Sequence, residues 1–158
     1  MSPRAAWRLE ALGFEHVYDY VGGKADWLAS GRPRAGRAAG EVYAGDLVDP
    51  DPPTCALADR VSDLGAALRA SRYGFTLVIS DRRVLLGRVR RSALAAASEE
   101  ARAEDVMEPG PSTVRYDTPA SQLIERLAHK KLRTAIVTTP TGRLVGVFDR
   151  AAAARRLA

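Results

Sequence analysis

The second part of the sequence repeats itself at a fixed spacing, with residues 46–99 matching residues 105–158. The alignment needs no gap, and 13 of its 54 positions are identical, where a chain of this composition would give about four by chance. The matching apolar residues fall where a helix or a strand would face the interior. One copy of this length buries too little surface to be stable alone. We therefore expect two copies of one unit packed sheet against sheet around a pseudo-twofold axis.

Each copy predicts the same order of elements, β-α-β-β-α. An amphipathic helix follows Asp59 in the first copy and Thr118-Pro119 in the second, because these residues are typical of helix N-termini. Two apolar, β-branched runs joined by a turn then predict a hairpin in each copy. The other expected elements are strands 54–56, 75–79 and 84–89 with helix 92–98, and strands 113–115, 135–137 and 143–148 with helix 150–157.

The composition excludes several classes of protein. The chain has 158 residues and is 46% hydrophobic and 27% charged, which allows a folded core. No apolar run reaches the roughly 18 residues that span a bilayer, and the N-terminus lacks the apolar core of a signal peptide. The single cysteine, Cys55, excludes an internal disulfide, and with two histidines no zinc-ligand pattern can be written. We therefore expect a cytoplasmic protein with no metal site and no contact with a membrane.

Several motifs of the second copy resemble a cystathionine beta-synthase (CBS) domain. They lie at residues 106–109, 113–114, 132–137 and 142–148. Residues 41–99 resemble a more divergent CBS domain, so about three quarters of the chain resembles a tandem CBS pair. The resemblance implies an α+β fold with two domains, 41–99 and 100–158, after an N-terminal segment, 1–40. It also implies a regulatory module that commonly forms a homodimer and senses a small molecule, usually an adenine nucleotide such as AMP or ATP.

The predicted ligand clefts lie where the last strand of each copy meets the closing helix. The first N–H groups of a helix are unpaired and favour a phosphate, and arginine suits phosphate oxygens. Backbone groups near Cys55 and Val114 can contact the edge of a base. The candidate ligand-binding residues are Thr54, Cys55, Arg88, Arg90 and Arg91 in the first copy and Thr113, Val114, Arg133, Ala135, Asp149 and Arg150 in the second. Solvated surface arginines are the competing interpretation.

Both copies depart from the ribose-binding pattern of CBS domains, which has a Ser or Thr three residues after the strand glycine and an Asp three residues later. Arg90 and Ala93 occupy these positions in the first copy, and Asp149 and Ala152 do in the second. Alanine accepts no hydrogen bond from a ribose, and losing such a bond costs about 1.5–3 kcal/mol. Asp149 also brings negative charge to the position of a phosphate. If one cleft binds an anion, we expect it to be the arginine-rich first one.

The first forty residues predict an α-β-α extension, with a helix over 4–13, a strand over 14–21 and a second helix that ends at Gly31. Residues 17–27 resemble the C-terminal end of a rhodanese domain. The catalytic cysteine of a rhodanese lies in a loop before this segment, so we expect no sulfur transfer. The segment holds half of the aromatic residues, and we expect it to pack on the CBS pair or on a partner subunit.

The remaining polar residues suggest no catalytic site. Asp46, Asp49, Asp105 and Glu108 recur at repeat-related positions and are interpreted as helix caps or solvated acids, and Cys55 as a small core residue. No nucleophile–base–acid set or glycine-rich phosphate loop is present, so we expect no enzyme. The sequence predicts a regulatory module that passes a change in packing to an effector protein. Two alternatives remain, a ligand-free dimerisation scaffold and a weak nucleic-acid binder through the arginines between Arg82 and Arg91.

Overall fold

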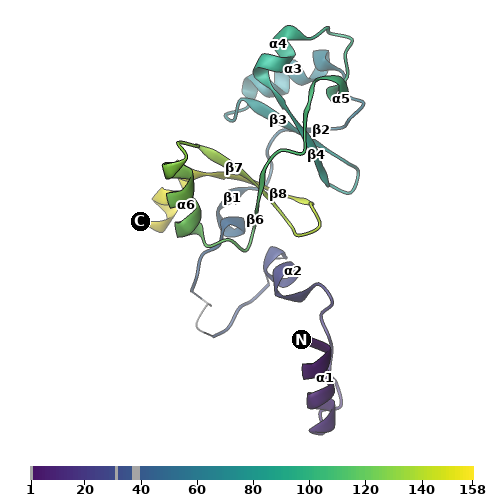
Figure 1. Cartoon of the computed structure of the whole chain (residues 1–158), viewed down its shortest axis with the longest axis vertical. Coiled ribbons are helices and arrows are strands. Elements are labelled where there is room, and N and C mark those ends of the chain that lie inside the picture. The colour runs from purple at the N-terminus through teal and green to yellow at the C-terminus, as the bar shows by residue number, and fades with distance from the viewer. Residues whose placement is uncertain (1, 31, 37–39) are drawn as a thin grey trace.

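The computed structural model describes residues 2–30, 32–36 and 40–158. The first copy contains the short 3-10 helix η1 (Ala44–Leu47), β1 (Val48–Asp49), β2 (Thr54–Cys55), α3 (Val61–Ala70), β3 (Phe75–Ile79), β4 (Leu85–Arg90) and α4 (Arg91–Ala96). The second copy contains α5 (Ala103–Val106), β5 (Glu108–Pro109), β6 (Thr113–Arg115), α6 (Ala120–His129), β7 (Thr134–Thr138), β8 (Leu144–Asp149) and α7 (Arg150–Leu157). The helices α1 (Ser2–Ala11) and α2 (Gly23–Ala29) precede both copies, as Figure 1 shows.

The spacing of the sequence repeat is reproduced in the structure. The helices α3 and α6 begin and end at equivalent positions of the repeat, and so do the hairpin strands β3 and β7 and β4 and β8. The copies also bond to each other in a symmetric way. Leu85 N donates to Gly142 O at 3.0 Å, and Leu144 N donates to Arg83 O at 2.8 Å. Each atom of one bond is the repeat equivalent of an atom in the other, so the predicted pseudo-twofold duplication is confirmed.

The predicted caps of the two long helices are wrong. The residue before α3 is Arg60 and the residue before α6 is Pro119, and neither accepts a hydrogen bond through its side chain. Asp59 instead closes the preceding turn, because its carboxylate accepts from Ala56 N at 2.9 Å. The helix boundaries therefore lie one or two residues beyond the residues that favoured a start.

Each sheet is completed by a short strand from the other copy. The strand orders are β1-β8-β7-β6 and β2-β3-β4-β5. The strand β1 of the first copy pairs antiparallel with β8, and β5 of the second copy pairs antiparallel with β4. The predicted strands β2 and β6 lie parallel beside β3 and β7. The two copies are thus interlocked, and neither sheet is built from one continuous repeat.

Three apolar cores hold the body together. One lies between each sheet and the helices that cover it, including a short helix from the other copy, and the third lies between the two sheets. The third core is formed by Phe75, Leu77, Ile136, Leu144 and Val147. Because both copies contribute to this core, a change in the packing of one sheet alters the packing of the other.

The N-terminal extension differs from the expected α-β-α order. The helix α1 ends before Gly13, whose φ of 92° stops it, but residues 14–21 form no strand, and the prediction is wrong. A lone strand leaves its backbone groups unpaired, and no strand in the described part of the chain pairs with this segment. The helix α2 reaches the body, where Leu28 packs against the core of the second copy, and so does Arg34, which pairs with Asp46 at 3.2 Å. The helix α1 lies away from both sheets (Figure 1). Among the described residues, no helix is long and apolar enough to cross a membrane.

Candidate functional site

One row of paired residues crosses the first sheet. Thr54 pairs with Leu77, Leu77 pairs with Arg88, and Arg88 pairs with Glu108. Residues that pair across neighbouring strands point to the same face of a sheet. Leu77 lies in the core between the sheets. Thr54, Arg88 and Glu108 therefore lie on the face that looks toward the second copy.

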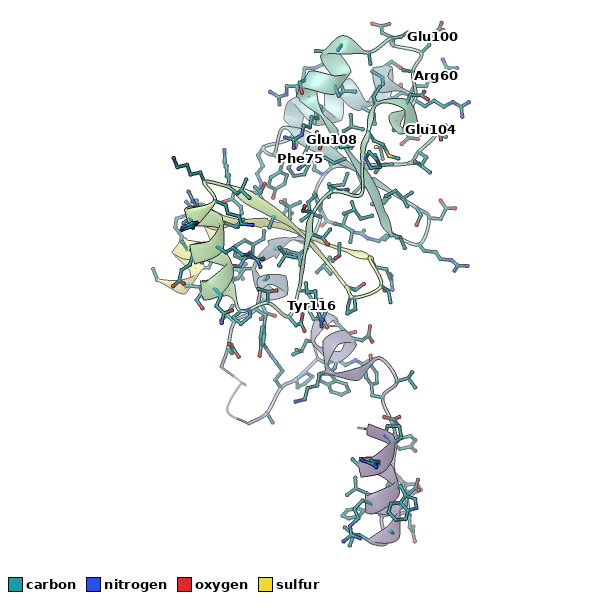
Figure 2. The ribbon with its side chains drawn as sticks, in the orientation of Figure 1. Arg60, Phe75, Glu100, Glu104, Glu108 and Tyr116 are labelled. Atoms are coloured by element: carbon teal, nitrogen blue, oxygen red, sulfur yellow. The ribbon has the colours of Figure 1, made fainter. Side chains whose placement is uncertain are left out.

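Glu108 binds two of the predicted ligand residues. Its carboxylate oxygens lie 2.6 Å from Arg88 Nη2 and 2.5 Å from Arg90 Nε. The Arg88 guanidinium also lies 5.8 Å from the centre of the Phe75 ring, and Figure 2 shows Glu108 and Phe75 close together. Donation by Arg88, and then by Arg90, holds the pKa of the Glu108 carboxyl below its ordinary value. The cluster has two positive charges and one negative charge, so an anion is attracted to it.

Arg91 does not join this cluster. Its Nη2 donates to Leu68 O at 3.0 Å, and its side chain lines a groove between α3 and α4. The helix that begins at Arg91 has only six residues and no side-chain cap, so its N-terminal dipole adds little. Arg88 and Arg90 thus face the second copy while Arg91 faces the outside, and the arginines between Arg82 and Arg91 do not form one continuous surface.

The equivalent position in the second copy is occupied by an acid. Asp149, the repeat equivalent of Arg90, accepts from Ala152 N at 2.9 Å and lies 3.5 Å from Arg133 Nε. Although burial raises the pKa of Asp149, the Ala152 N–H and the charge of Arg133 lower it below its ordinary value. Arg150 N bonds to Arg133 O at 3.0 Å. The Asp149 carboxylate therefore already occupies the anion position at the start of α7.

The other predicted site residues divide between the cores and the sheet edges. Cys55 is 5% exposed, and burial, followed by the charge of Asp59, raises its pKa to about 12. Val114 and Ala135 pack against the core on the helix side of the second sheet. Thr113 is exposed on β6. Because β2 and β6 are edge strands, backbone groups on their outer sides lack a strand partner and can bond to a ligand.

The repeat-related acids have two different roles. Asp46 and Asp105 cap η1 and α5, as predicted, because each accepts from the backbone N–H three residues earlier at 2.9 Å. Asp49 instead links β1, which lies in the second sheet, to the loop between α3 and β3 of the same copy, accepting from Tyr73 Oη at 2.7 Å and from Arg72 Nη2 at 2.8 Å. Donation by Tyr73 holds the pKa of Asp49 below its ordinary value. Neither this pairing nor that of Glu108 was predicted, since both depend on strands exchanged between copies. No group of three metal-ligating side chains lies within the described residues.

Comparison with protein families and curated proteins places the second copy in a known group. Residues 103–158 match the model of the CBS domain family. Over 114 residues, 72% of this chain, the sequence is 31% identical to a GMP reductase of Mycobacterium tuberculosis. The chain spans about a quarter of the length of that relative, 24%.

Solved structures share the fold of both copies. The CBS-pair protein CBSX2 from Arabidopsis thaliana is 22% identical, with a TM-score of 0.63 over 74% of this chain and 94% of its own. The CBS domains of a transcriptional regulator from Streptococcus pneumoniae are 20% identical, with a TM-score of 0.62 over 72% and 98%. The cytosolic domain of the Mg2+ channel MgtE, in complex with ATP, is 22% identical, with a TM-score of 0.62 over 75% and 50%. CBSX2 has also been solved in complex with AMP.

Proposed function

We propose that this chain, whose body has the fold of a tandem CBS pair, is a regulatory module that binds a small anion of the adenine-nucleotide class and catalyses no reaction. The observation that carries the proposal is the pair Arg88 and Arg90, which both bind Glu108 on the face toward the second copy. Planar guanidinium groups suit phosphate oxygens. Similar folds solved with ATP or AMP support this class of ligand.

Glu108 acts in this proposal as an internal competitor of the ligand. In the ligand-free protein, the Glu108 carboxylate holds Arg88 and Arg90 in place. A phosphate that binds the two arginines replaces this carboxylate. The outer edge of β2, beside Thr54, offers backbone groups to the base. Ala93 lies where related domains hold the ribose, so the phosphate contributes more of the affinity here.

The signal would pass through the core between the sheets. Arg88 pairs with Leu77, and Leu77 belongs to that core together with residues of the second copy. A ligand that moves Arg88 therefore changes the packing of both copies. We further propose that two copies associate as a homodimer and that an effector protein reads the change. A cytoplasmic location and a rhodanese-derived N-terminal segment stay predictions.

Thermal unfolding in the presence of nucleotides tests the proposed function. We expect AMP, ADP, ATP or NADH, which all carry phosphate, to stabilise the wild type at millimolar concentration, by about 2.7 kcal/mol at a hundred times the dissociation constant. The double variant Arg88→Ala with Arg90→Ala should lose this stabilisation. Glu108→Gln should strengthen it, because the competing charge is gone while the side-chain size is kept.

The matched control removes the same charge elsewhere. Arg155→Ala with Arg156→Ala changes two exposed arginines in the last turn of α7, and ligand stabilisation should persist. If this control loses stabilisation as fully as the site variant, the effect is one of net charge and the site is wrong. If no nucleotide stabilises the wild type, the ligand-free scaffold is the better interpretation.

A further inference from the structure

A pocket of about 270 Å3 lies where the helix α2 meets the rest of the chain, and we call it the α2 pocket. Its lining comes from α2, from the segment that follows α2, and from the residue before η1. The lining residues are Lys24, Trp27 and Leu28, then Pro33, Arg34 and Ala35, and Tyr43. Residues three and four apart are neighbours on a helix, so the three residues of α2 share one face. Leu28 also packs against the core of the second copy, which places this face toward the body.

The lining has the composition of a small-molecule site. Such sites are lined mainly by apolar and aromatic side chains, with a few charged or polar groups that orient the ligand. In the α2 pocket the aromatic rings are those of Trp27 and Tyr43, and the charged side chains are Lys24 and Arg34. Among the described residues that line it, none is an acid. The lining therefore suits a ligand with a flat ring and a negative charge.

The Trp27 ring is held in place without a ligand. Its indole N–H donates to Pro33 O at 2.8 Å. The Tyr20 ring meets it edge to face, with 5.4 Å between the ring centres. The Arg32 guanidinium lies 5.1 Å from the centre of the indole ring. Because these contacts fix the ring in advance, a ligand loses less free energy in ordering it.

The Arg34 guanidinium is also held in place. It donates to Glu41 O at 2.9 Å and to the Asp46 carboxylate at 3.2 Å, and it lies 5.1 Å from the centre of the Tyr43 ring. A guanidinium has five N–H donors, so donors remain for a ligand. The Glu41 carboxylate accepts from Tyr43 Oη at 2.9 Å, so both acids beside the pocket are already bonded. Lys24 forms no ion pair or side-chain hydrogen bond with the described residues, and its charge is available.

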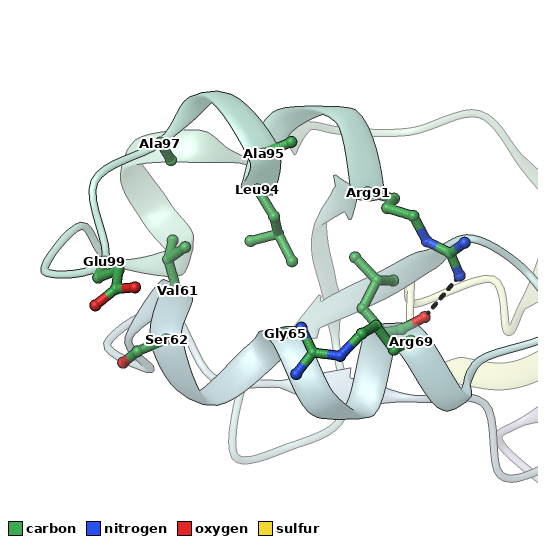
Figure 3. A pocket seen from close by; sticks show the side chains of 10 residues that line it. Val61, Ser62, Gly65, Arg69, Arg91, Leu94, Ala95, Ala97 and Glu99 are labelled. Atoms are coloured by element: carbon green, nitrogen blue, oxygen red, sulfur yellow. Dashed lines mark hydrogen bonds between the residues drawn. The ribbon is translucent and has the colours of Figure 1, made fainter.

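The larger groove between α3 and α4 lacks this combination. Its volume is about 400 Å3, and none of the described residues that line it is aromatic. Figure 3 shows an acid, Glu99, at one end of the groove and Arg91 at the other, where Arg91 donates to Leu68 O at 3.0 Å. Charges of both signs and a bonded arginine favour no particular class of ligand. The α2 pocket, with two rings and an unpaired lysine, favours one.

We propose that the α2 pocket binds a small aromatic anion, a flat ring that carries a carboxylate or a phosphate. The ring lies against Trp27 and Tyr43, and the acid group binds the Lys24 ammonium and a remaining N–H of Arg34. Pockets for drug-sized ligands span about 300–1,000 Å3, so the α2 pocket holds one ring system with its acid group. This site is separate from Arg88 and Arg90 and does not rest on the function proposed above.

A ligand in the α2 pocket joins the N-terminal segment to the body. Lys24 and Trp27 come from α2, whereas Tyr43 directly precedes η1. Asp46 of η1 accepts both from Arg34 and from Tyr43 N, the latter at 2.9 Å. Because the ligand contacts both sides of this junction, its binding stabilises the docking of α2.

The fluorescence of Trp27 tests the proposal in the full chain. The chain has two tryptophans, and Trp7→Phe on α1 leaves Trp27 as the single reporter. Benzoate and phenyl phosphate should each change its emission in a saturable way, and saturation by one of them alone identifies the acid group. Benzyl alcohol, which lacks the charge, and acetate or inorganic phosphate, which lack the ring, should bind at least about tenfold more weakly.

Two variants with matched controls locate the binding. Ala35→Leu fills the pocket from an exposed position and should raise the dissociation constant at least about tenfold, while Ala154→Leu, at an exposed alanine of α7, should not. Lys24→Gln should raise it about two- to fivefold, and Lys130→Gln, at an exposed lysine beyond α6, should leave it unchanged. The far-ultraviolet circular dichroism of each variant should equal that of the wild type.

The proposal is overturned if neither benzoate nor phenyl phosphate gives a saturable change, or if the control variants lose binding as fully as the pocket variants. Its outcome is separable from that of the nucleotide site. Arg88→Ala with Arg90→Ala should bind benzoate as the wild type does, and Lys24→Gln should keep its stabilisation by nucleotide. Loss of benzoate binding in the double arginine variant would place the anion at the other site and contradict the α2 pocket alone.

Discussion

At the scale of single residues, two acids at the ends of strands set the difference between the two predicted ligand sites. Glu108 neutralises part of a positive site, whereas Asp149 fills the anion position of its own helix. The sequence showed that Asp149 opposes an anion, because the residue lies at the start of a predicted helix. It did not show the role of Glu108, which depends on the pairing of β5 with a strand of the other copy.

The cap at Asp149 gives a prediction for stability. Asp149→Ala removes the acceptor of the Ala152 N–H and should lower the free energy of unfolding by about 1 kcal/mol. Asp149→Asn keeps a capping oxygen and should lose much less. Urea unfolding at neutral pH measures both variants, and equal losses would show that the charge of Asp149, rather than its cap, stabilises the fold.

The same carboxyl predicts a pH dependence. The pKa of Asp149 is lower in the folded protein than its ordinary value, so its contribution is fully present above the unfolded pKa of about 3.9. It is lost as the pH falls through the lower, folded value. The wild type should therefore be more stable than Asp149→Ala at pH 5 or above, roughly, and the difference should shrink below pH 4 or so. A difference that grows on acidification would contradict this assignment.

At the scale of elements, the exchanged strands explain why two glycines at equivalent positions tolerate substitution differently. A Cβ at Gly146 would meet the backbone oxygen of Asp49 and lie 2.9 Å from Val48 Cβ, both on the exchanged strand β1. A Cβ at Gly87 would meet first the sulfur of Met107, a side chain that can rotate away, while the backbone oxygen of Glu108 lies farther off, at 3.1 Å. The backbone of Asp49 cannot rotate away in this manner. An added Cβ should therefore cost more stability at Gly146 than at Gly87.

We expect Gly146→Ala to lower the free energy of unfolding by about 1–3 kcal/mol, and Gly87→Ala by less. Urea unfolding of the two variants against the wild type measures the difference. Each glycine serves as the control for the other, because both lie at the same point of the repeat. A larger loss at Gly87 would mean that Met107 is held more rigidly than the strand β1.

The elements that the sequence predicted are those with a periodic pattern. The long helices and the hairpin strands recur at the spacing of the repeat because their buried faces are apolar in both copies. The strands β1 and β5 have two residues each, too few for an alternating pattern. Residues 14–21 are rich in aromatic residues and valine, which favour strands, but a strand needs a neighbour, and a single sequence does not say whether one exists.

At the scale of the whole molecule, charged residues at repeat-related positions make the two copies unequal. The common core requires both copies, and the repeat alone predicted that arrangement. Under the proposed function, charge decides which of the two predicted sites binds a ligand. Arg90 and Arg88 give the first copy a positive site, while Asp149 and Val147 stand at the equivalent positions of the second. A nucleotide should therefore occupy one cleft of each chain and leave the other empty.

A two-dimensional NMR titration of the full chain with AMP and ATP tests this claim most directly. We predict saturable shifts of the backbone amides of Arg88, Arg90 and Glu108, with smaller changes at the equivalent residues Val147 and Asp149. Shifts centred on Asp149 instead, or no saturable shift with either nucleotide at millimolar concentration, would contradict the account.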